Sequence, residues 1–115
     1  MKAILSLAIM LFTLATFAQE QRVEFEKSDN NLVKATYYFA DNSDIIERVG
    51  FFNKDKELHG VWISYNEAGE KTAVAQYENG LKHGEWFYYT NGKVKVVTYE
   101  FNKITDVKTK DVAVN

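Results

Sequence analysis

Cysteine and proline are both absent from this sequence of 115 residues. Without cysteine the chain has no disulfide, no thiol nucleophile, no cysteine-ligated zinc and no cysteine that could carry a lipid. A domain of this kind must be held together by ordinary packing. Proline removes a hydrogen-bond donor from a strand, so its absence leaves every position free to join a β-ladder. The two absences therefore favour a chain of central strands stabilised by packing alone.

An excess of basic residues is also missing. The chain has 14 Lys and Arg against 16 Asp and Glu, for a formal net charge of −2 at pH 7. Nucleic acids and anionic lipids attract proteins with basic surfaces. The composition therefore argues against nucleic acid as a partner and makes membrane lipid an unfavoured one.

A long apolar run occurs only at the beginning of the chain. Met1-Lys2 gives a short positive start, residues 3–12 are almost continuously apolar, and the small residues Thr16 and Ala18 precede a cleavage point ahead of Gln19. This order is typical of a cleavable secretory signal peptide over residues 1–18, and the run is short for a membrane span. An uncleaved anchor is the alternative. We expect export to the periplasm of a bacterium or out of the cell.

The rest of the sequence predicts strands and turns. An N-terminal segment with a short strand covers residues 19–31, and alternating β-branched and aromatic runs separated by turn residues cover residues 32–103. Asn-Gly at 79–80 and at 91–92 predicts type I′ hairpin turns. Residues 104–115 form either a last edge strand or a tail, and their weak alternation favours the tail. No segment has helical spacing. We therefore predict an all-β fold, a meander of antiparallel hairpins in a single twisted sheet.

One phrase occurs twice in the sequence. His59-Gly60-Val61-Trp62 returns as His83-Gly84-Glu85-Trp86, with a spacing of 24 residues (59 to 83), and each copy continues to a Tyr and a Gly. A fixed period of this size is typical of repeat proteins, in which each unit is one supersecondary element. With a weaker earlier copy, the pattern predicts about three hairpin repeats.

The repeated phrase resembles a known family. Gly-x-Trp-x-x-Tyr, a Gly turn, and a strand ending in Tyr-x-Asn-Gly are similar to the variant MORN repeats of bacterial proteins, several of which are grouped as YwqK-like antitoxins. The matching residues are Gly60, Trp62, Tyr65, Gly69, Tyr77, Asn79, Gly80, Gly84, Trp86, Tyr89 and Gly92. After Tyr99 the pattern departs, because Phe101-Asn102-Lys103 replaces Asn-Gly, so we expect the array to end there. The resemblance implies hairpin repeats and an interaction function.

The repeated residues, with Tyr99 added, are interpreted first as structural: glycines at turns and aromatics as the spine of the sheet. A binding role is the alternative. In the strand of residues 85–89 alternate side chains face opposite sides, so Trp86 and Tyr88 lie on one face and Phe87 and Tyr89 on the other. A single sheet cannot cover both faces, and an open aromatic face is typical of a partner site. Trp86 and Tyr88 are therefore the candidate partner-binding residues.

Residues for catalysis or cofactor binding are not evident. His59 and His83 stand one hairpin apart, about 10 Å across two strand spacings, which is too far for one metal ion. Ser28, Ser43 and Ser64 lie in no nucleophile motif, and the acidic residues cluster in turns. We predict no enzyme activity, no cofactor and no metal.

Two functions remain open at this point. The favoured one is an exported, non-enzymatic protein-interaction module with a MORN-like sheet, whose partner and oligomeric state the sequence does not name. The alternative is an antitoxin or immunity-type protein that binds and neutralises a cognate toxin. Lipid binding is a third possibility, which the acidic balance disfavours.

Overall fold

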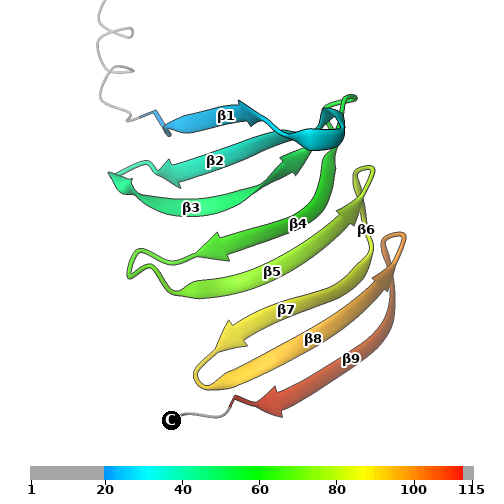
Figure 1. Cartoon of the computed structure of the whole chain (residues 1–115). Coiled ribbons are helices and arrows are strands. Elements are labelled where there is room, and N and C mark those ends of the chain that lie inside the picture. Colours follow the sequence, from blue (N-terminus) through cyan, green and yellow to red (C-terminus); the bar gives the residue numbers. More distant parts are fainter. Residues whose placement is uncertain (1–19, 113–115) are drawn as a thin grey trace, which may run out of the picture.

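A computed structural model describes residues 20–112, which form one open, twisted sheet of antiparallel strands (Figure 1). The only helical piece in this range is a short 3-10 turn, η1 (Asp29–Asn31). The nine strands are β1 (Val23–Lys27), β2 (Val33–Phe39), β3 (Asn42–Phe52), β4 (Leu58–Tyr65), β5 (Lys71–Glu78), β6 (Leu81–Lys82), β7 (Gly84–Thr90), β8 (Lys93–Glu100) and β9 (Lys103–Asp111).

Neighbours in the sheet are neighbours in the chain. The order is β1-β2-β3-β4-β5-β7-β8-β9, and the two-residue strand β6 pairs with the end of β5. The predicted all-β class and single antiparallel sheet are therefore confirmed. The predicted signal peptide, residues 1–18, lies outside the described residues.

The sheet continues past the point where the sequence predicts an end. Phe101 and Asn102 have φ of 46° and 72°, close to the 46° and 86° of Asn79-Gly80 and the 47° and 77° of Asn91-Gly92. All three pairs thus have the two positive φ values of a type I′ turn. The Oδ1 of Asn102 accepts the backbone N–H of Lys82 at 2.8 Å. Asn tolerates positive φ and is held here by that bond, so the chain turns into β9 instead of ending as a tail.

Two other turns share a different local design. Asn53–Glu57 and Asn66–Glu70 are both Asn-x-x-x-Glu segments, and in each the Asn Oδ1 accepts the N–H groups of the third and fifth residues at 2.9–3.0 Å. The fourth residue has positive φ, 64° at Lys56 and 82° at Gly69. An Asn side chain that replaces a backbone acceptor is a common turn device. The hydrogen bonds that shape each of these turns thus come from within its own five residues.

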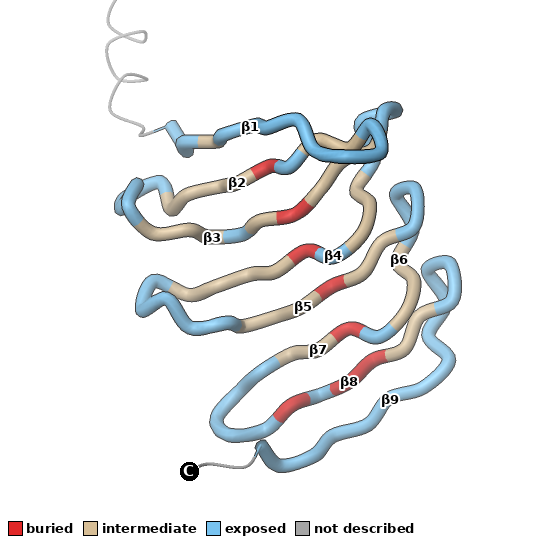
Figure 2. The backbone as a smooth tube through the Cα atoms, in the orientation of Figure 1, coloured by how far each residue is buried: buried red, intermediate tan, exposed pale blue. Residues whose placement is uncertain are grey.

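The core lies along the middle of the sheet, on the face that carries both tryptophans, here called the Trp face. Buried residues follow one another across the strands in Figure 2. The buried cluster consists of Ala35, Trp62, Ala75, Trp86 and Val97, and partly buried aromatic and apolar side chains pack around it: Tyr37, Phe52, Leu58, Tyr77, Tyr88 and Tyr99. On the opposite face, here called the back face, Val94 and Val96 are buried.

Each tryptophan is fixed by one hydrogen bond and one small neighbour. The indole N–H of Trp62 donates to the carbonyl of Phe51 at 3.0 Å, and that of Trp86 donates to the carbonyl of Gln76 at 2.9 Å. A Cβ placed on Gly50 would lie 1.9 Å from the Trp62 ring, so this indole lies directly over the backbone of β3. No motif in the sequence marks Gly50, because its role depends on the pairing of β3 with β4.

Candidate interaction surface

Trp86, the first predicted partner-binding residue, belongs to the core. Its side chain is 7% exposed. Its ring lies between those of Tyr77 and Tyr99, with centroids 5.1 Å away on each side. A partner could therefore contact little of the indole, and the spine interpretation describes its position better than the binding interpretation.

Tyr88, the second predicted residue, retains accessible surface. Its ring is tilted against Trp86 with a centroid distance of 6.2 Å, and the residue is half-buried. Burial raises the pKa of the Tyr88 hydroxyl to about 12, and the neighbouring Tyr99 and Tyr77 add to this increase. Tyr88 is thus an uncharged phenol at the border of the aromatic cluster.

The remaining predicted structural residues lie at turns, bulges and strand ends. All five glycines in the set have positive φ, which explains why a residue without a side chain stands there: Gly60, Gly69, Gly80, Gly84 and Gly92. Tyr65 is half-buried, and Tyr89 is 36% exposed on the back face.

The two histidines make different contacts in separate parts of the sheet. The Nδ1 of His59 accepts the backbone N–H of Asn79 at 3.1 Å. The ring of His83 stacks on Phe101 with a centroid distance of 4.5 Å, and its buried Nδ1 has no hydrogen-bond partner within residues 20–112. In that same range no three His, Asp or Glu side chains are grouped as metal ligands. The described residues also include no helix with the length and apolar character needed to cross a membrane.

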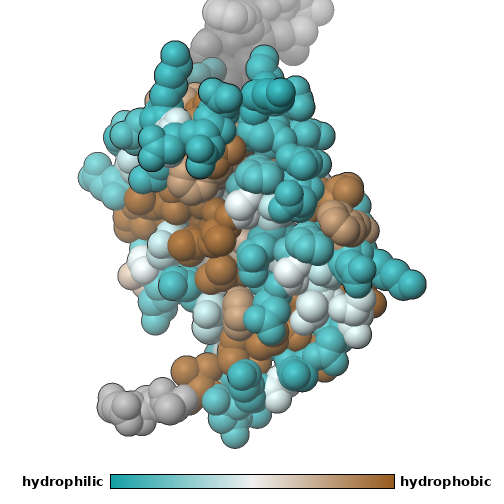
Figure 3. Space-filling model, turned by 45° about the vertical axis from the view of Figure 1, so that its right-hand side comes forward, coloured by the Kyte–Doolittle hydropathy of each residue, from teal (hydrophilic) through white to brown (hydrophobic). Residues whose placement is uncertain are grey.

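An apolar hollow opens on the Trp face at the N-terminal end of the sheet. It has a volume of about 440 Å³, and its walls are Phe25, Val33, Tyr37 and Phe52. Phe25 comes from β1, pairs with Ala35, and is 64% exposed. Figure 3 shows that hydrophobic residues gather in patches between hydrophilic ones on one side of the molecule. Apolar side chains lining a concave surface are the usual basis of a binding site.

Positive charge borders this hollow. Lys54 and Lys56, from the turn after β3, form part of its lining. The Arg48 guanidinium lies 4.1 Å from the centre of the Tyr37 ring, so a third cation is held against one of the walls. The surface combines one exposed aromatic side chain, Phe25, and two half-buried ones, Tyr37 and Phe52, with a cationic rim.

The sequence reasoning missed this hollow. Its signal was weak: Phe25 is an isolated aromatic between two glutamates, and Lys54 and Lys56 are ordinary turn residues. Only the pairing of β1 with β2 and of β2 with β3 brings these elements together.

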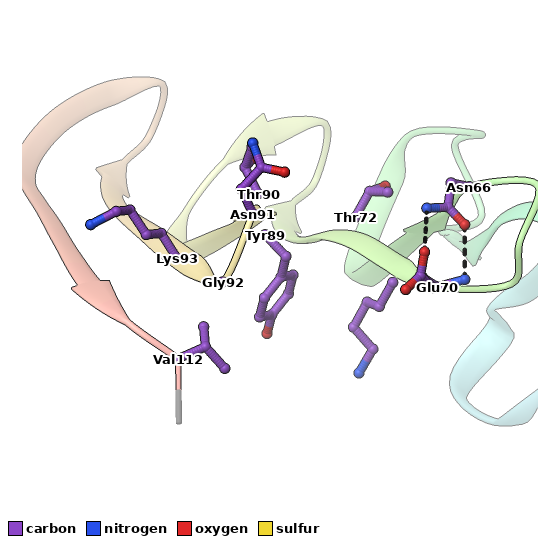
Figure 4. Close-up of a pocket in the computed structure, with 10 residues that line it drawn as sticks. Asn66, Glu70, Thr72, Tyr89, Thr90, Asn91, Gly92, Lys93 and Val112 are labelled. Atoms are coloured by element: carbon purple, nitrogen blue, oxygen red, sulfur yellow. Dashed lines mark hydrogen bonds between the residues drawn. The ribbon is translucent and has the colours of Figure 1, made fainter. Parts of the chain in front are cut away.

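A second hollow lies between the β4–β5 and β7–β8 turns. It has a volume of about 510 Å³, and Figure 4 shows the Tyr89 ring extending into it beside Val112. Asn66 and Glu70, at its other end, are bonded to each other through the Asn66 Nδ2 donor at 3.1 Å. These two polar groups are already bonded within their own turn.

Comparison of the chain with protein-family models, with curated proteins and with solved structures found no match.

Proposed function

We propose that this chain is an exported, non-enzymatic protein-interaction module made of MORN-like β-hairpin repeats, and that it binds its partner at the apolar hollow. The observation that carries the proposal is the apolar lining of that hollow, in which Phe25 is 64% exposed and Lys54 and Lys56 lie at the border. Exposed apolar surface costs free energy in water, and a partner that covers it recovers about 25 cal/mol per Å². Aromatic anchors inside a charged rim are typical of interaction sites.

The repeat part of the proposal is supported by equivalent contacts in two hairpins. Trp62 and Trp86 each donate to a carbonyl of the preceding long strand, at Phe51 and at Gln76. Repeat units generally present surfaces and not deep catalytic pockets. Such an architecture supports a binding role without turnover.

The chemistry of the hollow indicates the partner. Its walls accept a bulky apolar side chain, and the lysines attract negative charge. We propose a protein segment in which an apolar residue is flanked by Asp or Glu.

Capture from the envelope fraction of the native host tests the proposal. The whole chain, tagged at its C-terminus, would be used with Phe25→Ser and Lys54→Glu variants, and with Tyr89→Ser on the back face as the matched control. We expect one dominant protein that is lost with both hollow variants and kept with the control. Circular dichroism would check that each variant retains the sheet. A protein captured equally by all forms, or no captured protein, would contradict binding at the hollow.

The same preparation tests export. The mass of the protein recovered from the periplasm or medium should correspond to a chain that starts at Gln19. A full-length mass in the membrane fraction would instead indicate an anchor.

The antitoxin alternative rests on the family resemblance alone. A toxin-neutralising protein would capture one toxin and rescue cells that express it. The cationic rim of the hollow favours an acidic partner, so a strongly basic toxin among the captured proteins would move the proposal to the immunity role and away from this surface.

A further inference from the structure

Strand β9 is an uncovered edge of the sheet. All nine of its residues are exposed, and it pairs with β8 alone among residues 20–112. Figure 2 shows the exposed colour along its whole length. An exposed edge presents unpaired N–H and C=O groups and is a template for a further strand.

The hydrogen-bond pattern identifies which of these groups are free. The N–H of Val112 donates to the carbonyl of Gly92, at the start of β8, at 2.7 Å. In an antiparallel ladder successive residues alternate in direction, so Lys110 and Lys108 also turn their backbone groups toward β8. The backbone groups of Val107 and Thr109 therefore point outward.

The sequence of β9 is nearly palindromic in charge about Val107. Moving outward from that residue, Asp106 is matched by Lys108 and Thr105 by Thr109, while Ile104 corresponds to Lys110 without a match in charge. The register of β9 shifts at Thr105, so the charge match that matters is the pair next to Val107. Two antiparallel strands related by a two-fold axis at Val107 would place these residues opposite one another. Opposite charges facing each other across strands stabilise a sheet.

We propose that two copies of this chain associate through β9, antiparallel and centred on Val107, to form a two-fold dimer with one continuous sheet. Val107 of one copy lies opposite Val107 of the other. Their backbone N–H and C=O groups point away from β8 and can therefore pair with each other. Asp106 of each copy lies opposite Lys108 of the other. Asp106 and Lys108 are already neighbours within one chain, at 3.7 Å, so the dimer holds a square of alternating charges.

Neighbouring registers are disfavoured by the same charges. Centring the pair on Lys108 sets this lysine against its own copy, and centring it on Thr109 sets Lys108 against Lys110 of the second copy. Like charges directly opposite each other are destabilising. The lysines that protect an edge from general aggregation thus also disfavour the two registers shifted toward the C-terminus.

The other edge of the sheet lacks this complementarity. Strand β1 is centred on Phe25, and the corresponding self-pairing would place Glu24 opposite Glu26 of the second copy. A β1-to-β9 contact is heterologous, so it would produce a ring or a chain of growing length and not a two-fold pair. The proposed β9 dimer closes after two copies and is independent of the hollow proposed above.

Sedimentation equilibrium of the whole chain over a range of concentrations tests the dimer. We expect the mass to rise with concentration and to level off at twice that of the chain, with weaker association in high salt. Asp106→Lys and Lys108→Asp should each weaken dimerisation by roughly tenfold or more, because each sets like charges opposite each other. The double swap Asp106→Lys/Lys108→Asp should restore it. Glu67→Lys, in the exposed β4–β5 turn, controls for the change in net charge.

Four results would overturn the proposal. They are a monomer at every concentration, a mass that grows beyond two copies, single variants that dimerise like the unmodified chain, and a double swap that fails to restore association. If β9 instead pairs with a strand of another protein, this chain alone would remain a monomer at every concentration, which is the first of these results.

Discussion

The two tryptophans of the core make equivalent hydrogen bonds, each to a carbonyl of the adjacent strand. They differ in the small residue that the adjacent strand places next to the ring. Trp62 lies over Gly50, while Ala75 occupies the corresponding place beside Trp86, as the pairing of Val74 with Phe87 requires. A large ring in the middle of an open sheet therefore needs a small residue on the adjacent strand. Gly allows the Trp62 ring to lie on the backbone itself, and Ala adds only one methyl group beside Trp86.

The rings around them differ as well. Trp62 contacts Tyr37 and Phe52, whereas three tyrosines surround Trp86: Tyr77, Tyr88 and Tyr99. A single sheet has no second layer, so these neighbouring rings serve as its cover. The comparison indicates that the Trp86 cluster carries more of the stability.

Removing either indole gives the largest expected effect. Trp86→Ala should lower the free energy of unfolding by about 3–5 kcal/mol, and Trp62→Ala by an amount near the lower end of that range, because its ring has fewer aromatic contacts. Urea unfolding followed by circular dichroism would measure both. If Trp62→Ala proves the more damaging of the two, the proposed ranking of the clusters is wrong.

Adding one methyl group under Trp62 gives the next largest effect. Gly50→Ala would place a Cβ 1.9 Å from the Trp62 ring, so the ring or the strand must move. We expect a loss of about 1–3 kcal/mol, compared with about 0.5–1 kcal/mol for the matched change Ala75→Gly. Unfolding in urea again provides the measurement.

A double-mutant cycle separates the clash from other effects of Gly50. In a Trp62→Ala background the added methyl group has no ring to meet, so most of the cost of Gly50→Ala should disappear. Additive losses would show that Gly50 acts through its backbone and not through the approach of the indole.

Substitutions at the fourth residue of the two Asn-x-x-x-Glu turns should have smaller effects on stability. The two substitutions should change stability in opposite directions. Gly69→Ala should destabilise the sheet by about 1 kcal/mol, because φ is 82° and a side chain is strained there. Lys56→Gly, at the matching position with φ of 64°, relieves that strain and should be neutral or stabilising by a few tenths of a kcal/mol. Thermal unfolding of the two variants would show shifts in opposite directions, and a common direction would contradict the equivalence of the turns.

Local signals made the fold class predictable from the sequence. The Asn-Gly pairs at 79–80 and 91–92 require positive φ whatever surrounds them, and the structure has it. The continuation through Phe101-Asn102 was not predictable in the same way. Its turn depends on the bond from Lys82 to the Asn102 side chain, a contact between residues far apart in the chain.

The candidate surface was less predictable than the fold. Alternation placed Trp86 and Tyr88 on one face, but alternation does not say how deeply a ring is buried by its neighbours. The covering rings of Tyr77 and Tyr99 come from two other strands. Gly50 and Phe25 have no repeat partner in the sequence, and only strand pairing reveals that one lies under Trp62 and the other lines a hollow.

Alkaline pH should weaken the Trp86 cluster in particular, and the effect should be small because Tyr88 is only half-buried and solvent screens its charge. Burial raises the pKa of Tyr88 from 10.0 to about 12, so the folded chain keeps this proton at pH values where the unfolded chain loses it. The stabilisation is complete below about pH 10 and is lost as the pH rises through about 12. Urea unfolding in this interval should show a steeper decline for the unmodified chain than for Tyr88→Phe. Equal slopes would mean that the Tyr88 hydroxyl is as free to ionise in the sheet as in the unfolded chain.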